Sequence, residues 1–210
     1  MTRTYAGPVV ASPTGTVPAP GGKGDRTRQR LLEIAVRRFA QDGFRRTSVS
    51  DIARDAGVTP ATTYAYFAGK EALFEAAVDV DAAALIDKAR TSISGTTVRE
   101  RWVPLLTVLV THVAEHPLAA RVLGGGEPEV LHRLLNLPSL AVLRAELADD
   151  LREGQRNGNV RDDIDADLIA RGLETFALTL LMGYLQVGQR DEGRAEAVIA
   201  LVDAALRPPT

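Results

Sequence analysis

Two helix starts placed close together constrain this chain more than any other feature of its sequence. Ser48 has Asp51 three positions later, a variant of the capping box with which helices begin. Thr59 is followed by Pro60, and proline at the first helical position gives up no hydrogen bond. Gly57 lies between the two starts and is suited to end the first helix. The segment therefore predicts a helix-turn-helix arrangement, whose second helix fits the width of a DNA major groove.

The remainder of the chain predicts further helices. Apolar residues recur at spacings of three and four, as in Leu32, Ala35 and Phe39, and no stretch of useful length alternates as a strand does. Glycines and prolines, such as Pro117 and Pro138, mark the breaks. We therefore expect an all-α fold. The expected helices cover residues 25–42, 49–56, 60–67, 70 onward, 98–116, 118–123, 127–135, 138–156, 165–187 and 192–207.

The charge of the chain is distributed unevenly. Its formal net charge is −2, but residues 23–70 carry ten basic and five acidic side chains, a net charge of +5, whereas residues 71–210 have a net charge of −8. A basic segment joined to an acidic remainder is typical of a nucleic-acid-binding module attached to another part. Chance clustering is the alternative that charge alone leaves open.

Composition excludes several classes of protein. The 210 residues include no cysteine, which excludes disulfides, thiolate-bound metals and a thiol nucleophile. No uninterrupted apolar run approaches the ~20 residues that span a bilayer, and we find no core of a signal peptide near the start. We therefore expect a cytoplasmic protein that does not bind a membrane.

The sequence divides into three parts. Residues 1–24 contain four prolines and five glycines without an apolar period, so they predict a flexible arm that either trails along DNA or has no role. Residues 25–80 hold the first helices, and residues 47–66 hold the helix-turn-helix motif. Residues 81–210 predict a larger helical domain.

The stretch Thr47–Phe74 resembles the N-terminal domain of TetR-family transcriptional regulators. Its most specific part is the spacing Tyr-x-Tyr-Phe-x-x-Lys-Glu-x-Leu from Tyr64 to Leu73. The preceding helix, with Ile34-Ala35 and Phe39-Ala40 and followed by Gly43-Phe44, fits the same pattern. The detailed resemblance covers about residues 25–80, and the C-terminal part matches in organisation only.

The resemblance implies a homodimer in which each subunit has a three-helix, DNA-binding head and a larger helical domain for effector binding and dimerisation. Such a protein is a sequence-specific regulator of transcription, and we expect a repressor that its effector releases from a pseudo-palindromic operator in double-stranded DNA. By position, the resemblance also implies ten DNA-contacting residues, of which the last takes a phosphate: Ser48, Ser50, Thr59, Pro60, Ala61, Thr62, Tyr64, Ala65, Tyr66 and Lys70.

Two positions depart from the family pattern. Thr63 stands where an aliphatic residue is usual, which puts the packing of the second helix in question. Ala65 stands where a larger and often polar side chain is common, so one possible base contact is absent.

The C-terminal part contains few aromatic residues. Only Trp102, Phe176 and Tyr184 of the ten aromatic residues lie there, so a cavity in this domain would be lined by leucine and valine and would favour an aliphatic effector. The same side chains can equally fill a core. The candidate pocket residues are Trp102, Leu106, Leu109, Val113, Leu143, Phe176 and Leu180.

The last two expected helices, 165–187 and 192–207, are apolar on more than one face. A helix of this kind is buried on several sides, so we expect these segments of two subunits to form the homodimer interface. The alternative is that both helices pack inside one subunit.

Other chemistry has little support in the sequence. His112 and His116 are four positions apart, which is the spacing of a two-histidine metal site, but only Glu115 stands beside them. We therefore expect no metal, no cofactor and no catalytic residues. The rival interpretation is a helical small-molecule-binding protein or enzyme whose head is only structural.

Overall fold

The computed structural model describes residues 22–128, 136–187 and 192–208, and every regular element in these ranges is a helix. The all-α prediction is therefore confirmed. The expected helix 127–135 and the expected arm 1–24 fall largely outside the described residues. In chain order the helices are α1 (Lys23–Arg46), α2 (Val49–Asp55), α3 (Pro60–Tyr66), α4 (Lys70–Arg90), α5 (Val98–His112), the 3-10 turn η1 (Val113–Glu115), α6 (Pro117–Leu123), α8 (Pro138–Arg156), α9 (Ala166–Val187) and α10 (Glu192–Leu206).

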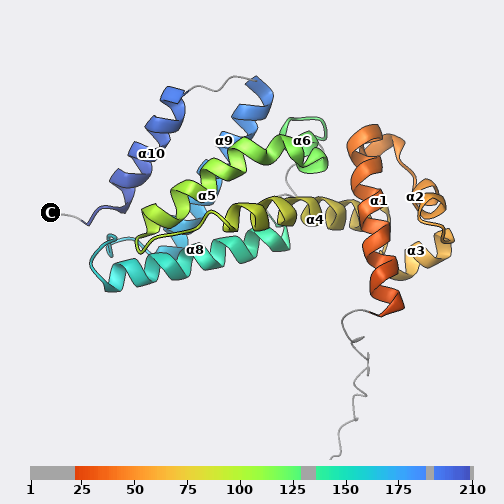
Figure 1. Cartoon of the computed structure of the whole chain (residues 1–210), viewed down its shortest axis with the longest axis horizontal. Helices are drawn as coiled ribbons and strands as arrows, with labels where there is room; N and C mark the ends of the chain where they lie inside the picture. Colours follow the sequence, from red (N-terminus) through yellow and green to blue (C-terminus); the bar gives the residue numbers. More distant parts are fainter. Residues whose placement is uncertain (1–21, 129–135, 188–191, 209–210) are drawn as a thin grey trace, which may run out of the picture.

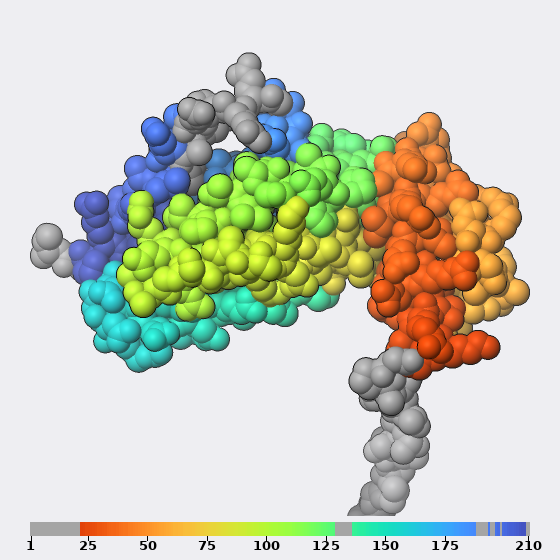
Figure 2. Space-filling view, in the orientation of Figure 1, coloured from red at the N-terminus to blue at the C-terminus, as the bar shows by residue number. Residues whose placement is uncertain are grey.

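The molecule is elongated, with a small helical head at one end. Helix α1 crosses the beginning of α4, and α2 and α3 lie on the outer side of α1 (Figure 1). Helix α4 then runs from the head into the body, where it packs against α5, α6 and α8. The space-filling view shows the head as the end of the molecule farthest from α10 (Figure 2). One helix is thus shared between the two parts.

The two helix starts behave as the sequence predicts. The Ser48 hydroxyl oxygen accepts the backbone N–H of Asp51 at 3.1 Å, and the Thr59 hydroxyl oxygen accepts that of Thr62 at 3.2 Å. Pro60 is the first residue of α3. Gly57 adopts a φ of 68°, a left-handed conformation that glycine reaches without steric strain.

Helix α1 is longer than its apolar period indicates. It begins at Lys23, two residues before the expected start, and its helical ladder is interrupted at Gly43, where φ is 80°. A side chain at Gly43 would place its Cβ 2.6 Å from Arg121 Nη2 and 2.7 Å from Glu127 Oε1. Glycine is favoured there by the left-handed backbone, and a larger residue would also displace the ends of the Arg121 and Glu127 side chains.

Helix α5 ends four residues before the expected boundary. The ladder stops at His112, and residues Val113–Glu115 form a 3-10 turn that leads into α6. The carboxylate of Asp81 on α4 accepts the backbone N–H groups of Leu118 and Ala119, both at 2.9 Å. A buried carboxylate at this helix start satisfies two N–H groups that have no partner within the helix. The position of α6 is thereby fixed from α4.

A continuous apolar core extends from the head into the body. Phe39, Phe44 and Phe74 form an aromatic cluster in which each of the latter two rings lies 5–6.1 Å from Phe39. The same core continues along α4 through Val78 and Leu85 to the side chains of α5, α6 and α9. Head and body therefore share one apolar core through α4.

Candidate DNA interface and effector cavity

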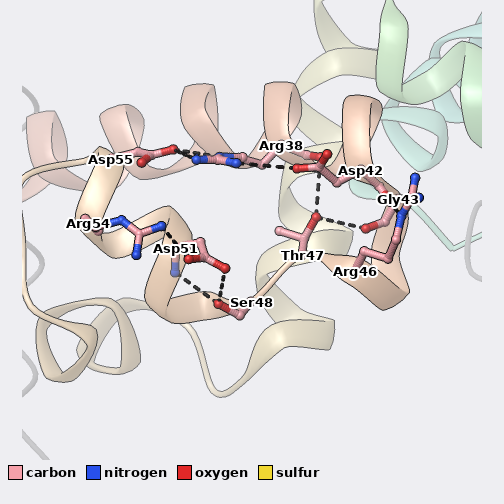
Figure 3. A network of polar contacts seen from close by, with 9 residues as sticks. All are labelled: Arg38, Asp42, Gly43, Arg46, Thr47, Ser48, Asp51, Arg54 and Asp55. Atoms are coloured by element: carbon pink, nitrogen blue, oxygen red, sulfur yellow. Dashed lines mark hydrogen bonds and ion pairs between the residues drawn. The ribbon is translucent and has the colours of Figure 1, made fainter.

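A polar network fixes the helix-turn-helix pair on α1. The Arg38 guanidinium forms an ion pair with Asp55 at the end of α2, with Nη2 and Oδ2 2.6 Å apart, and donates more weakly to Asp42 at 3.5 Å (Figure 3). The Thr47 hydroxyl donates to the Gly43 carbonyl oxygen at 2.8 Å. These bonds hold both ends of α2 against α1, so α3 is presented from a rigid base.

Ser48 takes part in a closed capping arrangement. Its hydroxyl donates to Asp51 Oδ2 at 2.6 Å, and the other oxygen of Asp51 forms an ion pair with Arg54 (Figure 3). The Ser48 hydrogen bond and then Arg54 hold the pKa of Asp51 below its ordinary value. The Ser48 hydroxyl proton is thus donated to Asp51, whereas Ser50, the second residue of α2, is exposed.

The residues expected on the reading helix lie mostly at the surface. Thr59, Pro60, Ala61, Tyr64 and Ala65 are exposed, whereas Thr62, Tyr66 and Lys70 are half-buried. Tyr64 is 57% exposed. The hydroxyl groups of Thr59 and Thr62 lie 2.9 Å apart and share one hydrogen bond. DNA contact by these residues stays a prediction.

Lys70 is more constrained than a free phosphate-binding lysine. Its Nζ lies 4.5 Å from the centroid of the Phe44 ring, a cation–π contact, and donates to the Arg45 carbonyl oxygen at 3.3 Å. The ammonium group is therefore held between the start of α4 and the end of α1. It keeps one further N–H direction for a phosphate.

Thr63 is buried in the head with 1% of its surface exposed, and its hydroxyl has no hydrogen-bond partner within the described part of the chain. Threonine in place of the usual aliphatic residue at position 63 therefore has an energetic cost. An unpaired hydroxyl sits in the apolar space where an aliphatic side chain would pack without that cost.

The first half of α1 places basic side chains near the reading helix, and none of them is among the ten residues predicted to contact DNA. The Arg28 guanidinium carbon lies 5.3 Å from the centroid of the Phe67 ring, at the end of α3. The Tyr66 hydroxyl also approaches Gly24, so the start of α1 lies beside the end of the reading helix. Lys23 and Arg26 belong to this same basic start. The positive charge of segment 23–70 is the signal that pointed to these residues.

The body contains an apolar cavity of about 140 Å³ between α4, α5, α6, α8, α9 and α10. Five of the seven predicted pocket residues line it: Trp102, Leu106, Leu109, Leu143 and Phe176. Val113 and Leu180 lie outside its lining. Val113 is fully buried in the core because α5 has already ended and the chain has turned toward α6. Whether an effector binds in this cavity stays a prediction.

The two histidines with metal-site spacing point to separate partners. His112 Nδ1 lies 2.9 Å from the Thr111 hydroxyl, whereas His116 Nδ1 lies 3.2 Å from the buried carboxylate of Asp81. In the described ranges, no group of three or more histidine, aspartate or glutamate residues is arranged to hold a metal ion.

Helix α9 leaves much of its apolar surface uncovered. Leu168 is 63% exposed, and Phe176 and Val187 are also exposed. By length and composition alone, α9 is the one single helix in the described ranges that is apolar enough to cross a bilayer, and Asp167, Arg171 and Glu174 interrupt its apolar stretch. A core helix of a water-soluble protein meets the same test, and Glu174 on α9 forms an ion pair with Arg144 of α8.

These features define the class of the protein. An all-α chain with a basic helix-turn-helix head on a larger helical body is a helix-turn-helix transcriptional regulator. The family model of bacterial regulatory proteins of the tetR family matches residues 31–77. The transcriptional repressor KstR2 of Rhodococcus jostii is 31% identical over 171 residues, which cover 78% of this chain and 81% of that protein. The chain belongs to the TetR family, and it is a DNA-binding regulator of transcription.

Solved structures have the same fold. A Rhodococcus protein described as a TetR-family transcriptional regulator superposes with a TM-score of 0.66 at 25% identity, over 87% of this chain and 99% of that chain. FadR of Bacillus subtilis, solved in complex with stearoyl-CoA, gives a TM-score of 0.60 at 20% identity, over 85% of this chain and 99% of that one. The matching family model and relatives are those of helix-turn-helix transcriptional regulators, so the rival interpretation of a purely structural head is set aside.

Proposed function

We propose that this protein is a homodimeric, cytoplasmic repressor without enzymatic activity, which a small apolar effector releases from a pseudo-palindromic operator. Residues 25–80 form the DNA-binding domain and residues 81–210 the effector-binding and dimerisation domain. The observation that carries the proposal is the shared helix α4. Its early residues Phe74 and Ala77 belong to the head core, and its later residues Ala82 and Leu85 line the cavity.

The shared helix supplies a route for release. An effector that occupies the cavity displaces α4 or α6, and α6 contacts α1 directly. The conformer favoured by the effector then holds the two heads at a spacing that no longer fits successive major grooves. A coupling of this kind is typically worth ~1–3 kcal/mol, which corresponds to a 5- to 150-fold change in operator affinity.

The uncovered apolar side chains of α9 and α10 support the homodimer. Leu168, Phe176 and Val187 on α9 and Leu201 on α10 are exposed in the single subunit, and burial of such apolar side chains against a second subunit would remove them from water. Two-fold symmetry makes such an interface self-complementary, and it gives the operator two inverted half-sites.

The lining of the cavity supports an aliphatic effector. Its wall is built almost entirely of leucine, valine, isoleucine and alanine side chains, with Trp102 and Phe176 as its aromatic members. FadR of Bacillus subtilis, which shares the fold, was solved with stearoyl-CoA, a ligand that carries a long aliphatic chain. The comparison with FadR supports an aliphatic effector for this cavity, and it does not identify a particular molecule.

The test is selection of duplex DNA from a random pool by the full-length protein, combined with light scattering at micromolar concentration. We expect a dimer and a selected site with two inverted half-sites. A monomer, or a selected site without two-fold symmetry, would contradict the proposed assembly. Retention on DNA-cellulose that shows no dependence on salt would contradict the proposed mode of DNA binding, because phosphate contacts release counterions.

A further inference from the structure

An ion pair forms part of the wall of the apolar cavity. Arg144 on α8 donates from Nη1 to both carboxylate oxygens of Glu174 on α9, at 3.0 Å to Oε1 and 2.7 Å to Oε2. Both side chains line the cavity, and only 12% of the Glu174 side chain is exposed. Arg99 is the third charged residue in the lining, and its Nε donates to both oxygens of Asp203. Every charge at the cavity is thus paired.

Stability does not explain this ion pair. A buried pair loses hydration at both partners, and replacement by apolar side chains of similar size is often neutral or stabilising. Helices α8 and α9 already pack along each other through apolar side chains such as Leu147 and Leu173. A wall made entirely of apolar residues would therefore close this part of the cavity at equal or lower cost.

The pair offers both hydrogen-bond polarities to a ligand. Arg144 uses only Nη1 for Glu174, and its Nε–H and Nη2–H groups have no hydrogen-bond partner among the residues that the structure describes. The Glu174 carboxylate has lone pairs beyond the two bonds from Arg144. An oxygen placed between these side chains can accept from Arg144, and an O–H placed there can donate to Glu174.

Charge balance selects among ligand head groups. A carboxylate or phosphate bound to Arg144 would place a second negative charge beside Glu174 in a largely apolar space, which is unfavourable. A hydroxyl adds no charge and satisfies both partners, and a carbonyl satisfies one. We propose that the effector is a neutral molecule with an aliphatic body and a hydroxyl group that binds between Arg144 and Glu174. This inference rests on the proposed role of the cavity as the effector site.

The chain contains its own reporter for this site. Trp102 is the only tryptophan in the sequence, it lines the cavity, and its indole N–H donates to Asp150 at 2.8 Å. Its fluorescence therefore reports occupancy without a label. Because the cavity volume of about 140 Å³ is close to that of an engineered cavity that binds benzene, six-carbon probes are suitable: 1-hexanol, hexanoate and benzene.

The experiment titrates each probe into the full-length protein at neutral pH. We expect 1-hexanol to change the Trp102 emission saturably and to bind about tenfold more tightly than hexanoate, because the hexanoate carboxylate would lie beside Glu174 and has no proton to donate to it. Equal or tighter binding of hexanoate overturns the neutral class and identifies Arg144 as an anion site. If none of the three probes changes the emission, the inference fails, while operator selection still tests the regulator independently.

Variants test the pair itself. The double variant Arg144→Met/Glu174→Leu leaves no lone buried charge, and we expect it to lose about tenfold in affinity for 1-hexanol while benzene binds as before. Equal losses for both probes would mean that the pair only maintains the shape of the cavity. The matched control is Arg90→Met/Glu146→Leu, which removes an ion pair between α4 and α8 that does not line the cavity. We expect this control to bind all probes as the parent protein does.

Discussion

Glu127, in the loop after α6, accepts the backbone N–H of Phe44 at the end of α1, with its Oε1 3.0 Å from the nitrogen. The same oxygen accepts Arg121 Nε–H at 2.8 Å, and Arg121 also reaches the Ala40 carbonyl oxygen at 3.4 Å. Helix α6, which precedes this loop, contributes Leu123 to the cavity wall. The body of the protein therefore holds the final turn of the head's first helix at a specific backbone group.

Substitution of Glu127 should loosen this junction. Glu127→Ala leaves the Phe44 N–H and the Arg121 guanidinium without their acceptor, and we expect a loss of about 2–3 kcal/mol in the free energy of unfolding. Urea unfolding measures the loss, and amide hydrogen exchange of Phe44 should become faster. The control is Asp162→Ala, an exposed acidic position in a loop. Unchanged exchange at Phe44 would show that Glu127 does not hold α1.

Removal of the unpaired hydroxyl should stabilise the head. Thr63→Val keeps the shape of the side chain and deletes a buried hydroxyl that has no partner among the described residues. We expect the free energy of unfolding to rise by about 1 kcal/mol, since burying an unpaired polar group costs that much or more. Thr62→Val is the comparison, because the Thr62 hydroxyl is paired with Thr59 and should give no such gain. A less stable Thr63→Val variant would contradict the argument.

Lys70 and Thr62 should affect DNA binding differently. Lys70→Ala should weaken binding to all duplexes alike and lower the slope of log K against log salt by about one unit, because one phosphate contact is lost. Thr62→Ala, on the reading helix, should instead change the preference between operator variants. Fluorescence anisotropy over a range of salt measures both. A changed base preference with an unchanged salt slope in Lys70→Ala would refute the phosphate role.

A charge on the exposed face of α9 should split the dimer. Leu168→Glu places a carboxylate where the proposed interface buries an apolar side chain, and an uncompensated buried charge is strongly unfavourable. Light scattering should report a monomer, and operator affinity should fall while the head stays folded. Leu168 is preferable to Phe176 because Phe176 also lines the cavity. The control is Val80→Glu on α4, an exposed apolar position outside the interface, which should remain dimeric.

The cap at Asp51 makes a small, pH-dependent contribution to stability. The Ser48 hydroxyl and Arg54 hold the pKa of this carboxyl below its ordinary value of 3.8. The folded state therefore binds the proton more weakly than the unfolded chain, so the contribution is complete above pH 3.8 and is lost as the pH falls through the folded pKa. The difference in unfolding free energy between the parent and Asp51→Asn should be constant from about pH 7 to about pH 5 and should shrink in more acidic solution. A difference that grows on acidification would reverse the sign.

Local signals made the helices of this protein readable from its sequence. The caps at Ser48 and Thr59, proline at the start of α3 and of α8, and glycine in the turn between α2 and α3 act within about four residues of the chain. The predicted boundaries of α8 agree with the structure, and those of α9 and α10 agree to within one residue. Helix caps are hydrogen bonds between residues that are close in the sequence, so they can be recognised without knowledge of tertiary contacts.

Contacts between distant residues decided the rest. Glu127 and Phe44 are 83 positions apart, and Asp81 accepts from a helix start 37 positions later, so neither contact has a local signal, although Gly43 and Pro117 mark the breaks themselves. The same holds for the cavity, which draws its wall from six helices and leaves out Val113 and Leu180. Periodicity shows which side chains are apolar, but only the packing of helices against one another determines which of them face a core, a cavity or a partner.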